Sequence, residues 1–211
     1  MIQLLKGKIK IDNEIKNSFK RLPEDKYTQF HNKNFRLRRF SKFIYTKKEI
    51  SDLKKDNKFF QNKKNNRYLG GINRKFEPIE DKIFRKFKAI ILNNFKFLIQ
   101  GKEFEIGLHQ IRIRCGRDFV GYPVPEGWHR DGFDYVAIIN INSKDIEGGI
   151  SRVRSKVTQD SDSYSCFLKT GEYLFFNDKK FFHFADPINI LKSKIGVRDT
   201  LVVTFSKVKI I

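Results

Sequence analysis

The run FEIGLHQIRIRC (residues 104–115) opens a strand-rich half of the sequence that decides the fold class. Further short apolar or alternating runs follow it: DYVAIININ (134–142), GISRVRS (149–155), SYSCFLK (163–169), GEYLFFND (171–178), FFHFADPI (181–188) and RDTLVVTFSKV (198–208). Gly, Pro, Asn and Asp stand between these runs, where they favour turns. Seven or eight short strands of this kind predict a mainly β domain, namely a sandwich, barrel or jelly roll.

Residues 1–100 predict a helical and strand cover for that β core. The clearest helix follows the Gly70-Gly71 turn, has Pro78 at a first helical position and ends at Gly101. Its apolar residues recur at three- and four-residue steps, at Ile79, Ile83, Phe87, Ile90, Ile91, Phe95 and Leu98. Such a stripe covers another apolar surface, most simply the sheet. We therefore expect a single domain over residues 1–211, with 1–100 as the cover and 101–211 as the β core that carries the site.

Three other segments belong to this cover. The segment 35–45, FRLRRFSKFIY, is dense in aromatic and β-branched residues and predicts a strand. The Lys- and Asn-rich segment 46–66 predicts a short helix that runs into a surface loop. Residues 1–22 predict a short helix or an ordered arm.

The charge of the chain is strongly positive and unevenly distributed. Its 211 residues include 44 Lys and Arg against 24 Asp and Glu, a net charge of +20. The first 100 residues hold 27 of these basic residues and 10 of the acidic ones, a net charge of +17. The excess of Lys, Asn, Ile and Phe is typical of an A/T-rich coding sequence. The alternative is a basic face that docks nucleic acid or another polyanion.

Composition also excludes several classes of protein. Aromatic residues make up 14% of the chain, which is too many for a disordered tail. The two cysteines, Cys115 and Cys166, cannot form a disulfide framework. No run of about 18 uncharged apolar residues exists, and lysines interrupt the N-terminal MIQLLKGKIK. We expect a cytoplasmic protein without a membrane partner.

Two histidines and one aspartate have the spacing of a metal site. His129 and Asp131 are two residues apart, so on an extended segment they project to the same face. His183 lies 52 residues after Asp131 in a strand-like run, which lets several strands pass before it returns to the pocket. Two histidines and one carboxylate are the facial triad of non-haem Fe(II). The alternatives are a hydrogen-bonded His129–Asp131 pair at a turn and a His183 buried in the core.

A candidate anion site follows in the last predicted strand. Arg198 lies 15 residues after His183, and Thr200 shares its strand face. A strand-borne arginine with a hydroxyl partner can grip a carboxylate bidentately. The set therefore indicates an iron site beside a keto-acid site. The alternatives are an exposed Arg198 or one paired with Asp199, and an ordinary strand residue at Thr200.

These residues resemble the Fe(II)- and 2-oxoglutarate-dependent dioxygenases. The resemblance is carried by His129-Arg130-Asp131, His183 and Arg198-Asp199-Thr200. VPEGWHRDGFDYVAIININ, EGGISRV, LFFNDKKFFHFADPI and GVRDTLVVTF are similar to the bacterial L-isoleucine dioxygenase-like branch, which hydroxylates free aliphatic amino acids. The likeness spans roughly residues 22 to 207.

The resemblance implies a double-stranded β-helix, a cupin-like jelly roll, and an enzyme that releases succinate and CO2. His129, Asp131 and His183 would hold Fe(II), and Arg198 with Thr200 would bind the 5-carboxylate of 2-oxoglutarate. O2 would be the second cosubstrate, and ascorbate is expected to stimulate turnover. The substrate implied is a small molecule, a free L-amino acid.

Four residues are candidate substrate contacts. Gln110 and Arg112 share one face of the run HQIRIR and could line the pocket or face solvent. Trp128 and Tyr135 flank the His129 segment and could form a pocket wall or pack in the core. Two other functions compete with hydroxylation of an amino acid: the same chemistry on a nucleic acid or other macromolecule docked by the basic half, and a metal-binding jelly roll without activity.

Overall fold

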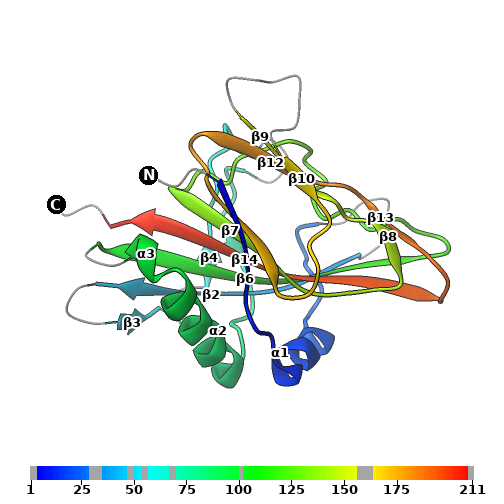
Figure 1. The fold of residues 1–211 in the computed structure, drawn as a ribbon, viewed down its shortest axis with the longest axis horizontal. Coiled ribbons are helices and arrows are strands. Elements are labelled where there is room, and N and C mark those ends of the chain that lie inside the picture. Colours follow the sequence, from blue (N-terminus) through cyan, green and yellow to red (C-terminus); the bar gives the residue numbers. More distant parts are fainter. Residues whose placement is uncertain are drawn as a thin grey trace.

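The largest element of the protein is a seven-stranded antiparallel sheet (Figure 1). The computed structural model describes residues 4–28, 35–46, 50–53, 57–66, 70–99, 102–155 and 164–208. The strand order of this sheet is β1-β11-β7-β14-β6-β2-β3. The strands span Leu4–Lys8 (β1), Arg36–Tyr45 (β2), Ile50–Asp52 (β3), Phe104–Gly116 (β6), Tyr135–Lys144 (β7), Glu172–Asn177 (β11) and Ile195–Lys207 (β14). The predicted strands over 35–45 and 104–115 are thus confirmed, and they are neighbours.

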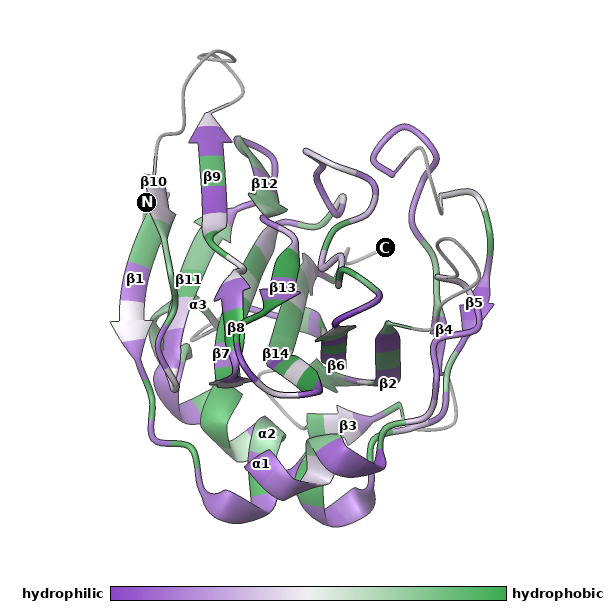
Figure 2. Cartoon of the chain, turned by 90° about the vertical axis from the view of Figure 1, so that its right-hand side faces the viewer, coloured by the Kyte–Doolittle hydropathy of each residue, from purple (hydrophilic) through white to green (hydrophobic). Residues whose placement is uncertain are grey.

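Smaller sheets lie over one face of the large sheet. One has the order β10-β9-β12, with β9 at Ser151–Ser155, β10 at Tyr164–Cys166 and β12 at Phe181–Ala185. Another pairs β8 (Ile146–Gly148) with β13 (Ile188–Ile190). These strands lie on the side of the large sheet opposite to helices α1 and α2 (Figure 2). The predicted mainly β fold, a jelly roll with a helical cover, is therefore confirmed.

The helices cover the other face of the large sheet. They are α1 (Asn13–Ser18), the 3-10 helix η1 (Phe19–Arg21), α2 (Asp81–Asn94) and α3 (Lys96–Ile99). The Asp12 carboxylate caps α1 by accepting a hydrogen bond from the Ile15 backbone N–H at 2.8 Å. None of the helices in the described ranges is long and apolar enough to span a membrane.

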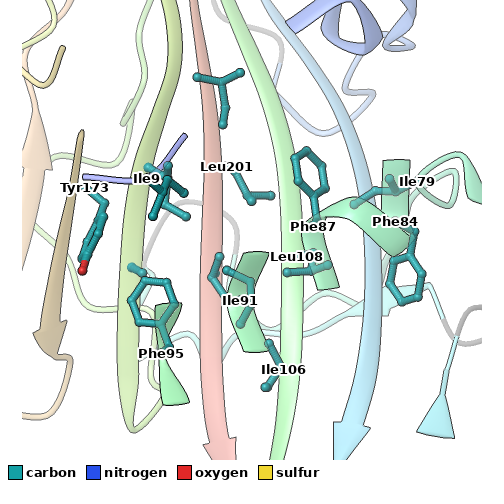
Figure 3. Packing of buried hydrophobic residues seen from close by; sticks show 14 of the residues in the cluster. Ile9, Ile79, Phe84, Phe87, Ile91, Phe95, Ile106, Leu108, Tyr173 and Leu201 are labelled. Carbon is teal, nitrogen blue, oxygen red and sulfur yellow. The ribbon is translucent and has the colours of Figure 1, made fainter. Parts of the chain in front are cut away.

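The predicted apolar stripe of α2 packs on the sheet. Phe87 and Ile91 are fully buried beside Leu108 of β6 and Leu201 of β14 (Figure 3). Each such buried side chain contributes roughly 1.5–3 kcal/mol of hydrophobic free energy. The helix begins at Asp81, a turn later than Pro78 would place it. The predicted stop at Gly101 lies outside the described residues.

The first 100 residues contribute strands as well as cover. β1 forms one edge of the large sheet, and β2 and β3 form the other. The short helix predicted within 46–66 is wrong for the described residues, which contain β3 and β4 (Lys58–Phe59). β4 pairs with β5 (Arg74–Lys75), and Phe59 of β4 is buried against Phe40 of β2.

Candidate active site

Two histidines from distant parts of the chain lie side by side. The His129 N–H donates to the His183 carbonyl at 3.2 Å, and the His183 N–H donates back at 2.9 Å. Asp131 reaches both rings, with Oδ1 at 3.4 Å from His129 Nε2 and Oδ2 at 3.5 Å from His183 Nε2. One ligand atom from each residue lies within 4.8 Å of the others. The three side chains could therefore bind a single ion.

The carboxylates beside this cluster favour a positive charge at the histidines. His129 Nδ1 lies 3.0 Å from the Gly127 carbonyl, so Nδ1 carries a proton and Nε2 faces the cluster. Burial opposes the charged form of His129, but the Glu126 and Asp131 carboxylates outweigh it and raise its pKa to about 9. Burial and the charge of His129 lower the pKa of His183 to about 3. A bound divalent ion would replace the proton on His129, because metal ligands must be deprotonated.

The segment that carries Asp131 is held by a buried carboxylate. Asp178 Oδ1 accepts the Asp131 N–H at 3.1 Å, and Oδ2 accepts those of Gly132 and Phe133 at 2.6 and 3.0 Å. Gly132 has a φ of +91°, a backbone conformation that residues other than glycine rarely adopt. Burial, together with the nearby Asp131, raises the pKa of Asp178 to about 7. This turn aims the Asp131 side chain at the two histidines.

The first half of the chain supplies a polar network around Asp131. Gln61 Nε2 donates to Asp131 Oδ1 at 2.7 Å, and its Oε1 accepts from Arg74 Nη2 at 2.6 Å. Asn66 Nδ2 donates to Gln61 Oε1 at 3.3 Å and to Glu126 Oε1 at 3.0 Å. These contacts orient the Asp131 carboxylate. The segment 46–66, which predicts a surface loop, thus contains buried residues of the site.

Arg198 and Thr200 form a polar corner on β14. Arg198 is 4% exposed, and its Nη2 donates to Ser151 Oγ at 3.0 Å. Burial lowers the pKa of Arg198 to about 10. Thr200 Oγ1 is buried without a hydrogen-bond partner among the described residues. Gly149, which has a φ of +67°, packs beside the arginine.

One cavity joins these two groups. His129, Asp131, His183, Arg198 and Thr200 all line it. The donor set of two imidazoles and one carboxylate fits Fe(II). The buried guanidinium and the unpartnered hydroxyl fit a carboxylate group. The structure thus brings together all five residues for which the sequence predicts metal or cosubstrate contacts.

Gln110 and Arg112, candidates for the pocket wall, lie on the other face of β6. Gln110 Nε2 donates to Ser18 Oγ at 2.8 Å, under the helical cover. Arg112 forms a bidentate pair with Asp199, at 2.6 and 2.8 Å. His109 and its alternate neighbours on β6 line the cavity instead. The structure corrects both predicted substrate contacts, because successive residues of a strand face opposite sides of the sheet and Gln110 and Arg112 face away from the cavity. The alternative pairing of Arg198 with Asp199 is also wrong, because Asp199 pairs with Arg112.

Trp128 and Tyr135 have packing roles. Trp128 packs against Phe184 with tilted rings whose centroids are 5.6 Å apart, and the Arg154 guanidinium carbon lies 4.4 Å from the centroid of the Trp128 ring. Tyr135 is buried in the core under the helices, where it stacks on Phe175 with centroids 5.4 Å apart. Neither lines the cavity. Tyr135 lies on the helical side of the large sheet, whereas Trp128 lies on the side of β9 and β12 but packs outside the cavity lining.

Several residues that line the cavity were not predicted from the sequence. They come from β2, from the β4–β5 segment, from β6 and from the loop before β7: Arg36, Arg38, Gln61, Arg74, His109 and Glu126. One signal was available, because the alternate residues Arg36 and Arg38 place two charges on the same face of the strand as Phe40. The Lys- and Asn-rich composition around Gln61 offered none.

Comparison with known proteins places this geometry in a family. The family model described as 2OG-Fe dioxygenase matches residues 16–204. An L-isoleucine-4-hydroxylase from Bacillus thuringiensis is 26% identical over 182 residues, which cover 81% of this chain and 75% of that protein.

Solved structures show the same fold. A bsmA homologue from Methylobium petroleophilum has a TM-score of 0.78 at 24% identity, covering 92% of this chain and 80% of its own. The structure of IDO from Bacillus thuringiensis has a TM-score of 0.72 at 22% identity, covering 93% and 82% of the two chains. These likenesses agree with the predicted jelly-roll architecture.

Proposed function

Since the chain belongs to the 2OG-Fe dioxygenase family, we propose that this oxygenase hydroxylates a free L-amino acid. The family uses Fe(II), 2-oxoglutarate and O2, so the products would be a hydroxylated amino acid, succinate and CO2. Support for the substrate class comes from the 26% identical relative named L-isoleucine-4-hydroxylase. The cavity, which is lined by both layers of the jelly roll, also suits a small molecule.

We assign the metal to His129, Asp131 and His183. The convergence of their ligand atoms within 4.8 Å is the observation that carries the proposal. Fe(II) bound there would supply the oxidative chemistry that inserts oxygen into a substrate C–H bond as 2-oxoglutarate is decarboxylated. The Gly127 carbonyl keeps His129 Nε2 free for the metal, and Gln61 orients Asp131.

We assign the 5-carboxylate of 2-oxoglutarate to Arg198 and Thr200. Arg198 has no carboxylate within 4.0 Å among the residues that the structure describes, so its cation is available to a ligand. Ser151 holds the guanidinium through one N–H and leaves the others free. The Thr200 hydroxyl, buried without a partner, supplies a further donor beside it.

The test is release of succinate with Fe(II), ascorbate and 2-oxoglutarate across a panel of free L-amino acids. The proposal predicts that at least one amino acid raises succinate release well above the uncoupled rate and is itself converted into a hydroxylated product. Nucleic acid is added in a parallel series at several salt concentrations. If nucleic acid stimulates succinate release more than every amino acid does, and if this stimulation declines steeply with salt, the substrate is a macromolecule and not a free amino acid.

If the protein is inactive in both series, only the metal-binding alternative remains.

Part of the basic charge of the first half lies inside the cavity, because Arg36, Arg38 and Arg74 line it. Those three charges are buried and cannot form an exposed docking face.

A further inference from the structure

Three arginines from the first half of the chain gather on one wall of the cavity. Arg36 and Arg38 project from β2 and Arg74 from β5, and they are 8%, 4% and 2% exposed. The Arg38 and Arg74 guanidinium carbons lie 5.1 and 4.8 Å from the centroid of the same Phe59 ring. Burial and their mutual repulsion lower the pKa values of Arg38 and Arg74. A buried cationic cluster of this kind calls for an anion.

Among the residues that the structure describes, only Arg36 of the three arginines has a carboxylate partner. Arg36 has Asp25, whose Oδ2 lies 3.5 Å from its Nε. Arg74 donates to the neutral Gln61, and Arg38 to His109 Nδ1 at 2.5 Å. Among the described residues neither Arg38 nor Arg74 has a carboxylate within 4.0 Å, and the Nε of each is buried without a partner. Most of their ten N–H donors are therefore unused.

His109 adds a further donor to this wall. Because an arginine can only donate, His109 Nδ1 accepts the Arg38 hydrogen bond and the ring proton lies on Nε2. Nε2 is buried and has no partner among the described residues, although the side chain lines the cavity. Phe40 and Phe59 hold the ring, with centroid separations of 4.6 and 4.5 Å. The donor is thus rigidly placed.

This wall is separate from the Arg198 corner. In the large sheet, Arg198 of β14 is paired with Ile113 of β6, which is paired with Arg36 of β2. Thr200, Ile111 and Arg38 form the adjacent row. Two strand spacings of about 4.8 Å therefore separate the two cationic groups at the backbone. The two cationic groups therefore enter the cavity from different strands, an arrangement that suits two anionic groups.

The wall is also close to the metal ligands. Arg74 Nη2 reaches Asp131 through one amide group, since Gln61 accepts from the former and donates to the latter. On the same side, Glu126 Oε2 is a buried carboxylate oxygen without a hydrogen-bond partner among the described residues. A cationic wall beside one unpartnered carboxylate oxygen is complementary to a zwitterion.

We propose that Arg38, Arg74 and His109 bind the α-carboxylate of the organic substrate, and that Glu126 accepts its α-ammonium group. The inference rests on the proposed function and names the residues that recognise the amino acid.

The test compares the best amino acid of the panel with two analogues, its primary amide and the carboxylic acid that lacks the amine. The wild type should use both analogues with kcat/KM reduced about 10-fold to 100-fold, the range for a lost hydrogen bond to a charged group. Arg74→Met should raise the KM for the amino acid by a similar factor while the amide loses little, so discrimination between acid and amide disappears. Glu126→Gln should remove discrimination against the deaminated acid.

Arg39→Met is the matched control. Arg39 is adjacent on β2 but faces the other side of the sheet, where it contacts Glu77 and the Pro78 carbonyl. The Arg39→Met variant loses the same charge as Arg74→Met and should keep the wild-type KM for the amino acid and for 2-oxoglutarate. Should Arg74→Met fail to fold, Arg38→Lys and Arg74→Lys keep the charge and lose the planar fork, and each should still raise the KM for the amino acid several-fold.

The outcomes separate this inference from the proposed function. A wild type that turns over no amino acid overturns the proposed function, and the inference with it. A wild type that is active on amino acids but accepts the amide equally well overturns the inference alone. The same holds if the arginine variants raise the KM for 2-oxoglutarate instead of that for the amino acid, because the cluster would then bind the cosubstrate.

Discussion

Replacing Arg198 with methionine tests the cosubstrate corner through both stability and binding. Among the described residues, the buried guanidinium has one hydrogen bond, to Ser151 Oγ at 3.0 Å, and no carboxylate within 4.0 Å. Methionine has a similar length and no charge. In the absence of 2-oxoglutarate, the substitution therefore removes a cation that the folded protein holds without a counter-ion.

The magnitudes follow from this burial. Burial lowers the pKa of Arg198 to about 10, which corresponds to roughly 3 kcal/mol against the charged form in the folded state. Removing the charge should raise the free energy of unfolding by up to about that amount, less the lost Ser151 contact. For a chain of this size each kcal/mol changes Tm by about 2–4 °C. The lost charged hydrogen bonds should at the same time raise the KM for 2-oxoglutarate at least about tenfold.

The assay is thermal unfolding of the wild type and Arg198→Met, each with and without 2-oxoglutarate, together with KM from succinate release. The wild type should gain Tm on addition of 2-oxoglutarate, and the variant should start at an equal or higher Tm and gain little. Arg198→Lys retains the charge without the planar fork and should have an intermediate KM. A variant that unfolds at a lower Tm than the wild type and keeps its KM would refute the reasoning, since Arg198 would then be a structural residue.

Three further predictions address the metal, the core and the surface. Alanine at any one of the three proposed metal ligands should abolish Fe(II)-dependent succinate release while circular dichroism shows a retained fold; near wild-type turnover would remove that residue from the site. Arg112→Met leaves Asp199 buried and unpaired, so denaturant unfolding should show a loss of about 3–5 kcal/mol with the KM for substrate unchanged, and Asp199→Leu in the same chain should restore most of it. Reversing the exposed Lys63 and Lys64 to Glu should keep kcat/KM within a few-fold at physiological salt, because salt screens the charges of exposed side chains, and a large loss would indicate a docking role.

The predicted site residues depend on spacing and strand parity. His129 and Asp131 share a face because they are two residues apart, and Thr200 follows Arg198 on β14 by the same rule. The apolar stripe of α2 is likewise a local pattern, and it packs on the sheet as its period requires. These features depend on residues close to one another in the chain, so the sequence alone could indicate them.

The sequence by itself determined a mainly β jelly roll with a helical cover and a set of side chains suited to Fe(II) and 2-oxoglutarate. Only the tertiary structure decided which face of β6 meets the cavity. Alternation shows that Gln110 and Arg112 share a face, but the helical cover, packed on that face, turns it away from the site. Arg38 and Arg74 reach the cavity through pairing of β2 with β6 and of β4 with β5. Such contacts join residues far apart in the chain, and no local period encodes which face they will cover.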